Sequence, residues 1–158
     1  MNTNTVEPTS SIVDWTADDS TKTPVVPDEF GTGADGLKTI FTRMSSLWRE
    51  PDDDEYFPPT RAAFDRAIEY LEQTGHAMMQ LHGAFPVGYV ATDDRGGIRV
   101  EWWHEQNQCV HLVVNHDSRS KDYTFVKLTD EDGVIERRVL PSRLAVRLAE
   151  IESLRRHG

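Results

Sequence analysis

The segment GGIRVEWWHEQNQCVHLVV, residues 96–114, gathers the side chains of this chain that are best suited to chemistry. It holds Cys109, the only cysteine, together with His104, His111 and Glu101. Cysteine, histidine and a carboxylate are the parts of a nucleophilic triad, and histidine with cysteine can also bind zinc. The way these residues are spaced along their strands decides which of the two chemistries is open to them.

The apolar residues of this segment alternate with polar ones, which predicts a β-hairpin because a strand places alternate side chains on opposite faces. We expect strands at 98–104 and 109–115, joined by the three-residue loop 105–107 with Asn107 in the left-handed conformation. The register should keep the apolar faces together, since a shift by one residue would bury the wrong face. The paired residues are then Trp102 with Val110, Val100 with Leu112, and Ile98 with Val114.

This register separates the two histidines and brings one of them next to a carboxylate. His104 and His111 fall on opposite faces and cannot share a metal ion, so we expect no metal site and no cofactor here. Glu101 lies opposite His111, at a cross-strand Cβ separation of about 5 Å. Cys109 is two residues from His111 on the same face, roughly 7 Å along the strand, and an acidic chain does not favour a thiolate. We therefore expect no catalytic residues, with a thiol hydrolase using Cys109, His111 and Glu101 as the alternative.

The strand face that carries Glu101 and Cys109 is not cleanly polar, although the solvent face of a one-sided sheet normally is. An apolar second face of this kind indicates contact with another part of the chain or with another molecule. The N-terminal segment SIVDW, residues 11–15, is a second apolar stretch that could dock on a surface. The expected partner-binding residues are Trp103, Val113 and Phe125 on this face and Trp15 in the N-terminal segment.

Two amphipathic helices are predicted before the hairpin. Residues 37–50 carry apolar side chains at helical spacing, and so do residues 60–75. Thr60 is a suitable N-cap for the second helix, and Gly75 is predicted to end it. Residues 83–88 then form a connector that leads to the strands.

Two further strands and a helix are predicted after the hairpin. The strands fall at about 122–128 and 133–140, and the helix at about 142–156 with Ser142 as its N-cap. Short strands joined by tight turns are typical of an antiparallel arrangement. The predicted fold class is α+β: a four-stranded antiparallel β-meander packed by two or three helices, with a disordered acidic N-terminal tail.

The predicted domain organisation is a tail at residues 1–36 and a single α+β domain at residues 37–158. The tail carries seven acidic residues against one lysine, and a segment of low hydrophobicity with net charge cannot offset the entropy cost of ordering. A second acidic cluster lies in EPDDDEYFPP, residues 50–59. Carboxylates suit a hard cation, but this cluster lacks the spacing and the glycine of a calcium loop, which favours a solvated loop.

The segment PVGYVATDDRGGIRVEWW, residues 86–103, resembles small uncharacterised bacterial proteins. In these proteins a proline-containing connector leads to a Gly-Gly turn and to a strand that ends in Glu-Trp. The resemblance covers roughly residues 58–150 and implies a helix followed by a meander. It supplies no activity and no site residues.

The formal net charge of −10 argues against general nucleic-acid binding, because an acidic chain repels phosphate. No apolar stretch approaches the ~20 residues of a membrane helix, so we expect no membrane contact. Residues 1–20 contain neither a basic residue nor an apolar run, which argues against a signal peptide and favours the cytoplasm.

These observations favour a non-catalytic interaction protein, such as an accessory, immunity or antitoxin-like subunit that binds and regulates a partner. The expected partner is another protein with a basic surface, because the chain is acidic, or a second copy of the chain in a homodimer. A second alternative is nucleic-acid binding through residues 137–158, where six arginines and two glutamates give a net charge of +4.

Overall fold

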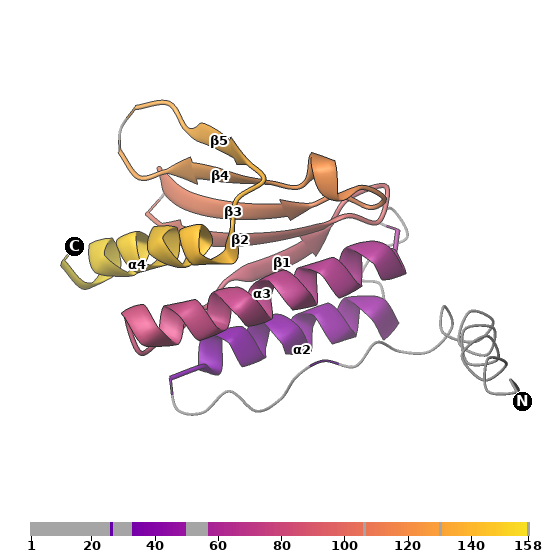
Figure 1. The fold of residues 1–158 in the computed structure, drawn as a ribbon, viewed down its shortest axis with the longest axis horizontal. Helices are drawn as coiled ribbons and strands as arrows, with labels where there is room; N and C mark the ends of the chain where they lie inside the picture. The colour runs from indigo at the N-terminus through magenta and orange to yellow at the C-terminus, as the bar shows by residue number, and fades with distance from the viewer. Residues whose placement is uncertain (1–25, 27–32, 50–56, 106, 130, 158) are drawn as a thin grey trace, which may run out of the picture.

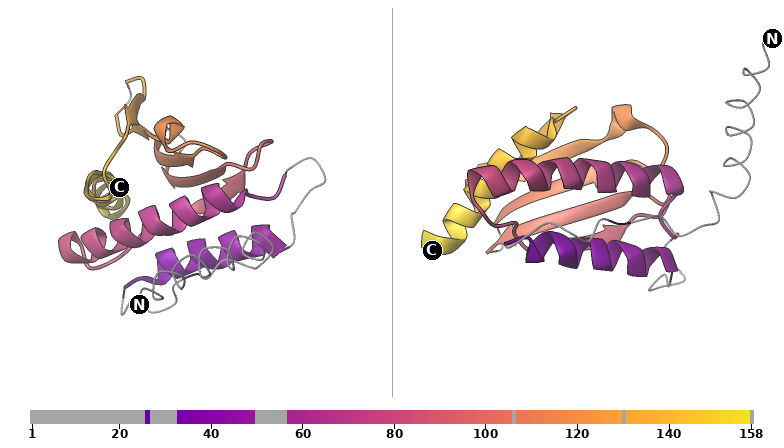
Figure 2. Two further views of the ribbon diagram at one scale, coloured as in Figure 1. Left: turned by 45° about the vertical axis from the view of Figure 1, so that its right-hand side comes forward. Right: turned by 60° about the horizontal axis from the view of Figure 1, so that its bottom comes forward.

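The computed structural model describes residues 26, 33–49, 57–105, 107–129 and 131–157. Within these ranges the chain forms three α-helices and a five-stranded antiparallel sheet, and the helices lie on one face of the sheet (Figures 1 and 2). The predicted α+β class and antiparallel meander are confirmed, but the sheet has one strand more than expected. Most of the predicted tail, including Trp15, lies outside the described residues, as does the acidic cluster up to residue 56.

Two helices precede the sheet. The first, α2 (Asp35–Arg49), begins two residues before the predicted position, and it buries the predicted apolar stripe. The second, α3 (Arg61–Leu81), starts at the expected N-cap, because the hydroxyl of Thr60 accepts a hydrogen bond from the amide of Ala63 at 3.2 Å.

Helix α3 does not end at Gly75, and that prediction was wrong. The helix continues to Leu81, and Gly75 lies buried within it. A Cβ atom at this position would stand 2.7 Å from Cδ2 of Leu37 in α2. The glycine therefore allows α2 and α3 to approach closely, and packing outweighs the propensity loss of about 1 kcal/mol that glycine brings to a helix interior.

The sheet is a simple meander in which each strand pairs with the next along the chain. The additional strand, β1, was missed because a four-residue strand is too short to show a period of two. A short 3-10 turn, η2 (Arg119–Lys121), lies in the connection between the third and fourth strands. In chain order the strands are β1 (Tyr89–Thr92), β2 (Ile98–His104), β3 (Gln108–Val114), β4 (Tyr123–Lys127) and β5 (Val134–Arg137).

The predicted hairpin register is confirmed: Trp102 pairs with Val110, Val100 with Leu112, and Ile98 with Val114. The three-residue loop between β2 and β3 is also confirmed. Glu105, the first residue of this loop, has a positive φ of 55°.

Helix α4 (Pro141–His157) returns to the helix-covered face and packs beside α3 and against β2 and β3. It begins one residue before the predicted N-cap at Ser142. The carbonyl of Leu140 accepts the first helical hydrogen bonds, from the amides of Arg143 at 2.9 Å and Leu144 at 3.1 Å. Proline suits the first helical position because its fixed φ fits there and its missing N–H would have had no helical partner.

The core fills the space between the helices and the sheet. Helix α2 packs against β1, and α3 lies between α2 and α4 (Figure 2). Trp102 is fully buried there, and its indole nitrogen donates a hydrogen bond to the carbonyl of Pro86 at 3.1 Å. None of the helices in the described ranges is long and apolar enough to cross a membrane.

Candidate functional site

No helix among the described residues covers the other face of the sheet, which we call the open face (Figure 2). Its residues are those that alternate away from the buried core positions of each strand. They are Tyr89 and Ala91 of β1; Arg99, Glu101 and Trp103 of β2; Cys109, His111 and Val113 of β3; Tyr123, Phe125 and Lys127 of β4; and Ile135 and Arg137 of β5.

Three aromatic rings form a cluster in the middle of the open face. The register places His111 opposite Phe125, and their ring centroids are 5.6 Å apart. Trp103 lies diagonally across from His111, with ring centroids 5.1 Å apart. Trp103 is 41% exposed, so the cluster presents a large apolar side chain to its surroundings.

The carboxylate of Glu101 orients Trp103 instead of His111. One oxygen accepts a hydrogen bond from the indole nitrogen of Trp103 at 2.9 Å, and the other lies 2.5 Å from Nε of Arg99. Glu101 does lie opposite His111, as predicted, but no hydrogen bond or ion pair joins these two side chains. Arg99 and Trp103 each lie two residues from Glu101 on the same strand and face. The positive charge of Arg99 strengthens its interaction with the carboxylate.

His111 is held in its neutral form. Burial lowers the pKa of its imidazole below the ordinary value, and the charge of Arg99 adds to the decrease, while Glu101 opposes it. Its Nε2 atom is buried and has no hydrogen-bond partner among the described residues. A buried ring nitrogen without a partner destabilises the isolated fold.

Cys109 is held as a protonated thiol. It is buried between Trp103 and Lys127 in the register of β2, β3 and β4. Burial raises the pKa of the thiol, Glu101 raises it further, and Lys127 opposes the rise. Because the thiol is buried and the neighbouring imidazole is not oriented by the carboxylate, this arrangement does not activate a cysteine nucleophile.

The open face differs in charge from the chain as a whole. Its strand residues carry a net charge of +2, against −10 for the chain. The charged strand residues are three cations, Arg99, Lys127 and Arg137, and one carboxylate, Glu101.

The structure brings together two of the four predicted partner-binding residues, Trp103 and Phe125, around His111. Val113 is on the same face but lies at the far end of β3, half-buried opposite Tyr123. Trp15 is outside the described residues.

Sequence reasoning missed Arg137 as part of this face. Its guanidinium carbon lies 6.0 Å from the ring centroid of Tyr123, and the two residues pair directly across β4 and β5. The sequence did contain this information. Side chains alternate along β5 as they do along β4, and this alternation places Arg137 on the open face. The strand predicted at 133–140 extended beyond β5, so the prediction did not show that the alternation of side chains stops after Arg137.

Three of the six arginines of the C-terminal segment, Arg143, Arg147 and Arg155, are paired with carboxylates. Arg147 contacts Glu136 closely and also Glu150, with 3.1 Å between the charged atoms. Arg155 contacts Glu152 at 2.8 Å and donates a hydrogen bond to the carbonyl of Trp103 at 3.0 Å. These pairs leave less positive charge for a phosphate backbone than the sequence count suggests.

Within the described ranges, no group of three or more histidine, cysteine, aspartate or glutamate side chains could hold a metal ion. The resemblance predicted from residues 86–103 stays a prediction. Comparisons of the chain with known protein families, with curated proteins and with solved structures found no match in any of the three.

Proposed function

We propose that this chain is a non-catalytic interaction protein whose open face binds an acidic, apolar segment of a partner protein. The observation that carries the proposal is Trp103, which stands 41% exposed in an aromatic cluster on a sheet face that no described helix covers.

An exposed tryptophan in a cluster of aromatic rings is typical of the centre of a protein–protein contact. Tryptophan combines a large apolar surface with few rotatable bonds, and it is enriched among the residues that dominate binding free energy. Trp103 is already oriented by its hydrogen bond to Glu101, at 2.9 Å. A side chain fixed before binding loses little conformational entropy when the partner arrives.

The charge of the open face selects the kind of partner. The whole chain favours a basic partner, but the strand residues around Trp103 carry a net charge of +2. Carboxylates of the partner would meet Arg137 and Lys127 at the surface, while its apolar side chains meet the aromatic cluster. Two copies of the chain placed face to face would oppose like charges, so this face favours a different protein over a homodimer.

This mode of action agrees with an accessory, immunity or antitoxin-like subunit in the cytoplasm, which acts by occupying a surface of its partner. It requires no activated nucleophile, and the buried, protonated thiol of Cys109 supplies none. An aromatic and cationic sheet face can also stack the bases of single-stranded nucleic acid. The acidic character of the rest of the chain opposes that occupant.

The test uses two adjacent arginines as a matched pair. Arg137 belongs to the open face, whereas Arg138 lies on the helix side of the sheet. The full chain is used to capture partners from a nuclease-treated lysate of the source cells, and the captured protein is then purified. Its dissociation constant is measured by calorimetry against the wild type, Trp103→Ala, Arg137→Glu and Arg138→Glu.

We expect Trp103→Ala and Arg137→Glu each to raise the dissociation constant at least about tenfold, and Arg138→Glu to leave it nearly unchanged. Equal effects of the two charge reversals would show that the open face is not the binding surface. Loss of all capture after nuclease treatment, with tight binding of an oligonucleotide instead, would replace the partner protein with a nucleic acid.

A further inference from the structure

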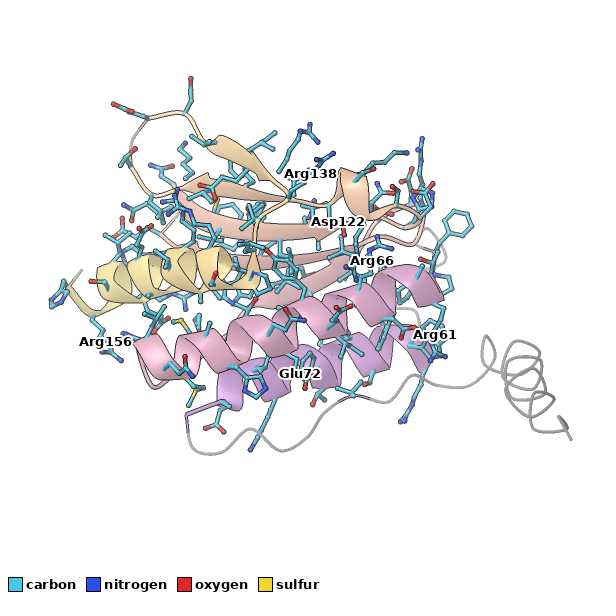
Figure 3. All side chains as sticks on the ribbon, viewed as in Figure 1. Arg61, Arg66, Glu72, Asp122, Arg138 and Arg156 are labelled. Atoms are coloured by element: carbon cyan, nitrogen blue, oxygen red, sulfur yellow. The ribbon has the colours of Figure 1, made fainter. Side chains whose placement is uncertain are left out.

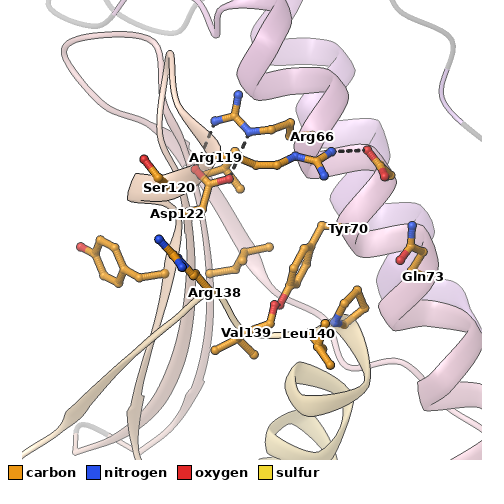
Figure 4. A pocket seen from close by; sticks show the side chains of 14 residues that line it. Arg66, Tyr70, Gln73, Arg119, Ser120, Asp122, Arg138, Val139 and Leu140 are labelled. Carbon is orange, nitrogen blue, oxygen red and sulfur yellow. Dashed lines mark hydrogen bonds and ion pairs between the residues drawn. The ribbon is translucent and has the colours of Figure 1, made fainter.

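We propose that a pocket on the helix side of the sheet, which shares only Tyr123 with the open face, binds a small organic anion with an apolar body. The pocket has a volume of about 460 Å³ and lies between α3, the η2 turn and residues 138–141 (Figure 4). This volume falls in the range of about 300–1,000 Å³ that is usual for small-molecule sites.

The pocket lies beside β3, between α3 and the segment that leads into α4. Figure 3 shows Arg66 on α3 and Arg138 after β5, with Asp122 between them, at the place where the two helices diverge. Leu112 and Val114 of β3 belong to the pocket lining and present their apolar side chains to the helix side of the sheet. An apolar ligand group could therefore be buried against the strands.

The walls of the pocket are held by hydrogen bonds before any ligand binds. The hydroxyl of Tyr70 donates to the carbonyl of Val139 and ties α3 to the segment that leads into α4. Burial raises the pKa of Tyr70, with Asp122 and Glu136 adding to the rise, so the hydroxyl stays protonated and keeps this bond. Because these walls are already fixed, little conformational entropy is lost when a ligand binds in the pocket.

The opposite wall is held by an ion pair. Both nitrogens of Arg66 that face Asp122 lie 3.1 Å from its carboxylate oxygens, and the amide of Asn115 donates to the same carboxylate at 2.6 Å. Asp122 is thus neutralised within the wall. It does not repel an anion as a free carboxylate would.

Two arginines at the rim of the pocket, Arg119 and Arg138, can bind an anion. Arg119 pairs with Glu69 at 2.8 Å, but both side chains are more than half exposed, so the pair is weak and Arg119 can turn to a ligand at little cost. Arg138 is exposed and makes no hydrogen bond or ion pair with any described residue. Three arginines and two carboxylates line the pocket, which leaves it one net positive charge.

The backbone at Arg138 adds an independent indication. Its φ of 56° places a non-glycine residue in the left-handed region, and strained residues of this kind concentrate at functional sites. The N-terminus of α4 also borders the pocket through Leu140 and Pro141 (Figure 4). The helix dipole there favours negative charge.

These features define the ligand chemistry. The apolar strands would receive an alkyl or aryl group, and the rim would receive one carboxylate or phosphate through Arg138 and Arg119. The probes are octanoate and octyl phosphate. Octanol, which lacks the anion, and inorganic phosphate, which lacks the apolar body, are the matched controls.

The experiment follows amide chemical shifts of the full ¹⁵N-labelled chain during titration with each probe. We expect saturable shifts at Ser120, Val139 and Leu140 with octanoate or octyl phosphate, and dissociation constants at least about tenfold weaker for both controls. Arg138→Gln should weaken octanoate binding about tenfold, the loss of one charge-assisted hydrogen bond, whereas Arg137→Gln should change it less than about twofold. Equal thermal midpoints of the two variants would show that neither effect comes from unfolding.

Three outcomes would overturn the inference. The first is no saturable binding of either anionic probe, and the second is equal weakening by Arg137→Gln and Arg138→Gln. The third is a set of shifts centred on Trp103, His111 and Phe125, which would mean that the probes bind the open face. Because the partner experiment depends on Trp103 and Arg137 and this one on Arg138, either proposal can fail without the other.

Discussion

Trp102 and Trp103 are consecutive residues of β2 that lie on opposite faces of the sheet. Trp102 is 0% exposed in the core beneath the helices, whereas Trp103 is 41% exposed on the open face. Trp102 packs edge-on against Phe85, with ring centroids 6.2 Å apart, and Trp103 contacts His111. The alternation of a strand thus places two identical side chains in different environments, one in the core and one at the surface.

Alanine substitutions should distinguish the buried tryptophan from the exposed one. Trp102→Ala removes a fully buried indole and leaves a cavity, so it should lower the free energy of unfolding by about 3–5 kcal/mol. Trp103→Ala should lower it by only about 1 kcal/mol, because much of its surface already meets solvent. Urea unfolding of both variants as monomers measures the difference. A larger loss for Trp103→Ala would mean that the helix-covered face is not the principal core.

Gly88→Ala should destabilise the fold by about 1–3 kcal/mol through overpacking. A Cβ atom at Gly88 would stand 2.8 Å from Nε1 of Trp102, whose indole is fixed in the core by its hydrogen bond to Pro86. The neighbouring substitution Val87→Ala is the control, because Val87 is exposed and should matter by less than about 0.5 kcal/mol. Thermal or urea unfolding gives both values, and similar effects of the two changes would contradict the expected packing of Trp102.

His111→Phe should stabilise the isolated chain by about 1 kcal/mol at neutral pH, since it removes a buried nitrogen without a partner and keeps an aromatic ring beside Trp103 and Phe125. The difference should grow in acid. The folded-state pKa of His111 lies below its ordinary value of 6.5, so protons bind the unfolded chain preferentially. The contribution of neutral His111 is therefore present above about pH 6.5 and is lost as the pH falls towards the folded-state pKa.

The check is urea unfolding of the wild type and His111→Phe at several pH values on both sides of that window. The wild type should lose more stability than the variant as the pH falls. Parallel curves would mean that the imidazole of His111 titrates alike in the folded and unfolded chains.

Cys109 should react slowly with iodoacetamide at neutral pH. Burial raises its pKa and also blocks access, so labelling of the folded chain should be at least about tenfold slower than labelling of the same thiol in urea. Cys109→Ser should leave partner binding intact. Fast labelling of the folded chain would instead restore the alternative of a thiol hydrolase using Glu101 and His111.

The register of the β2–β3 hairpin could be predicted from the sequence, and its strand bounds could be predicted to within one residue. The reason is that its pattern allows one solution: a shift by one residue would bury Arg99 and Glu101 and expose Val100 and Trp102. The helix stripes were predictable for the same reason, because the apolar period is long enough to fix the buried face. The exposed position of Trp103 followed from this register alone.

Tertiary structure alone decided the features that depend on neighbours distant in the chain. The sequence predicts that Gly75 ends a helix, but in the structure Leu37 packs closely against this glycine inside α3. The sequence places Glu101 opposite His111, but in the structure Trp103 and Arg99 bind its carboxylate oxygens. The pocket is the clearest case, because its walls come from α3, the η2 turn and residues 138–141. Periodicity in a sequence reports which face of an element is buried, but only the packing of the elements decides where they leave space and which charges meet there.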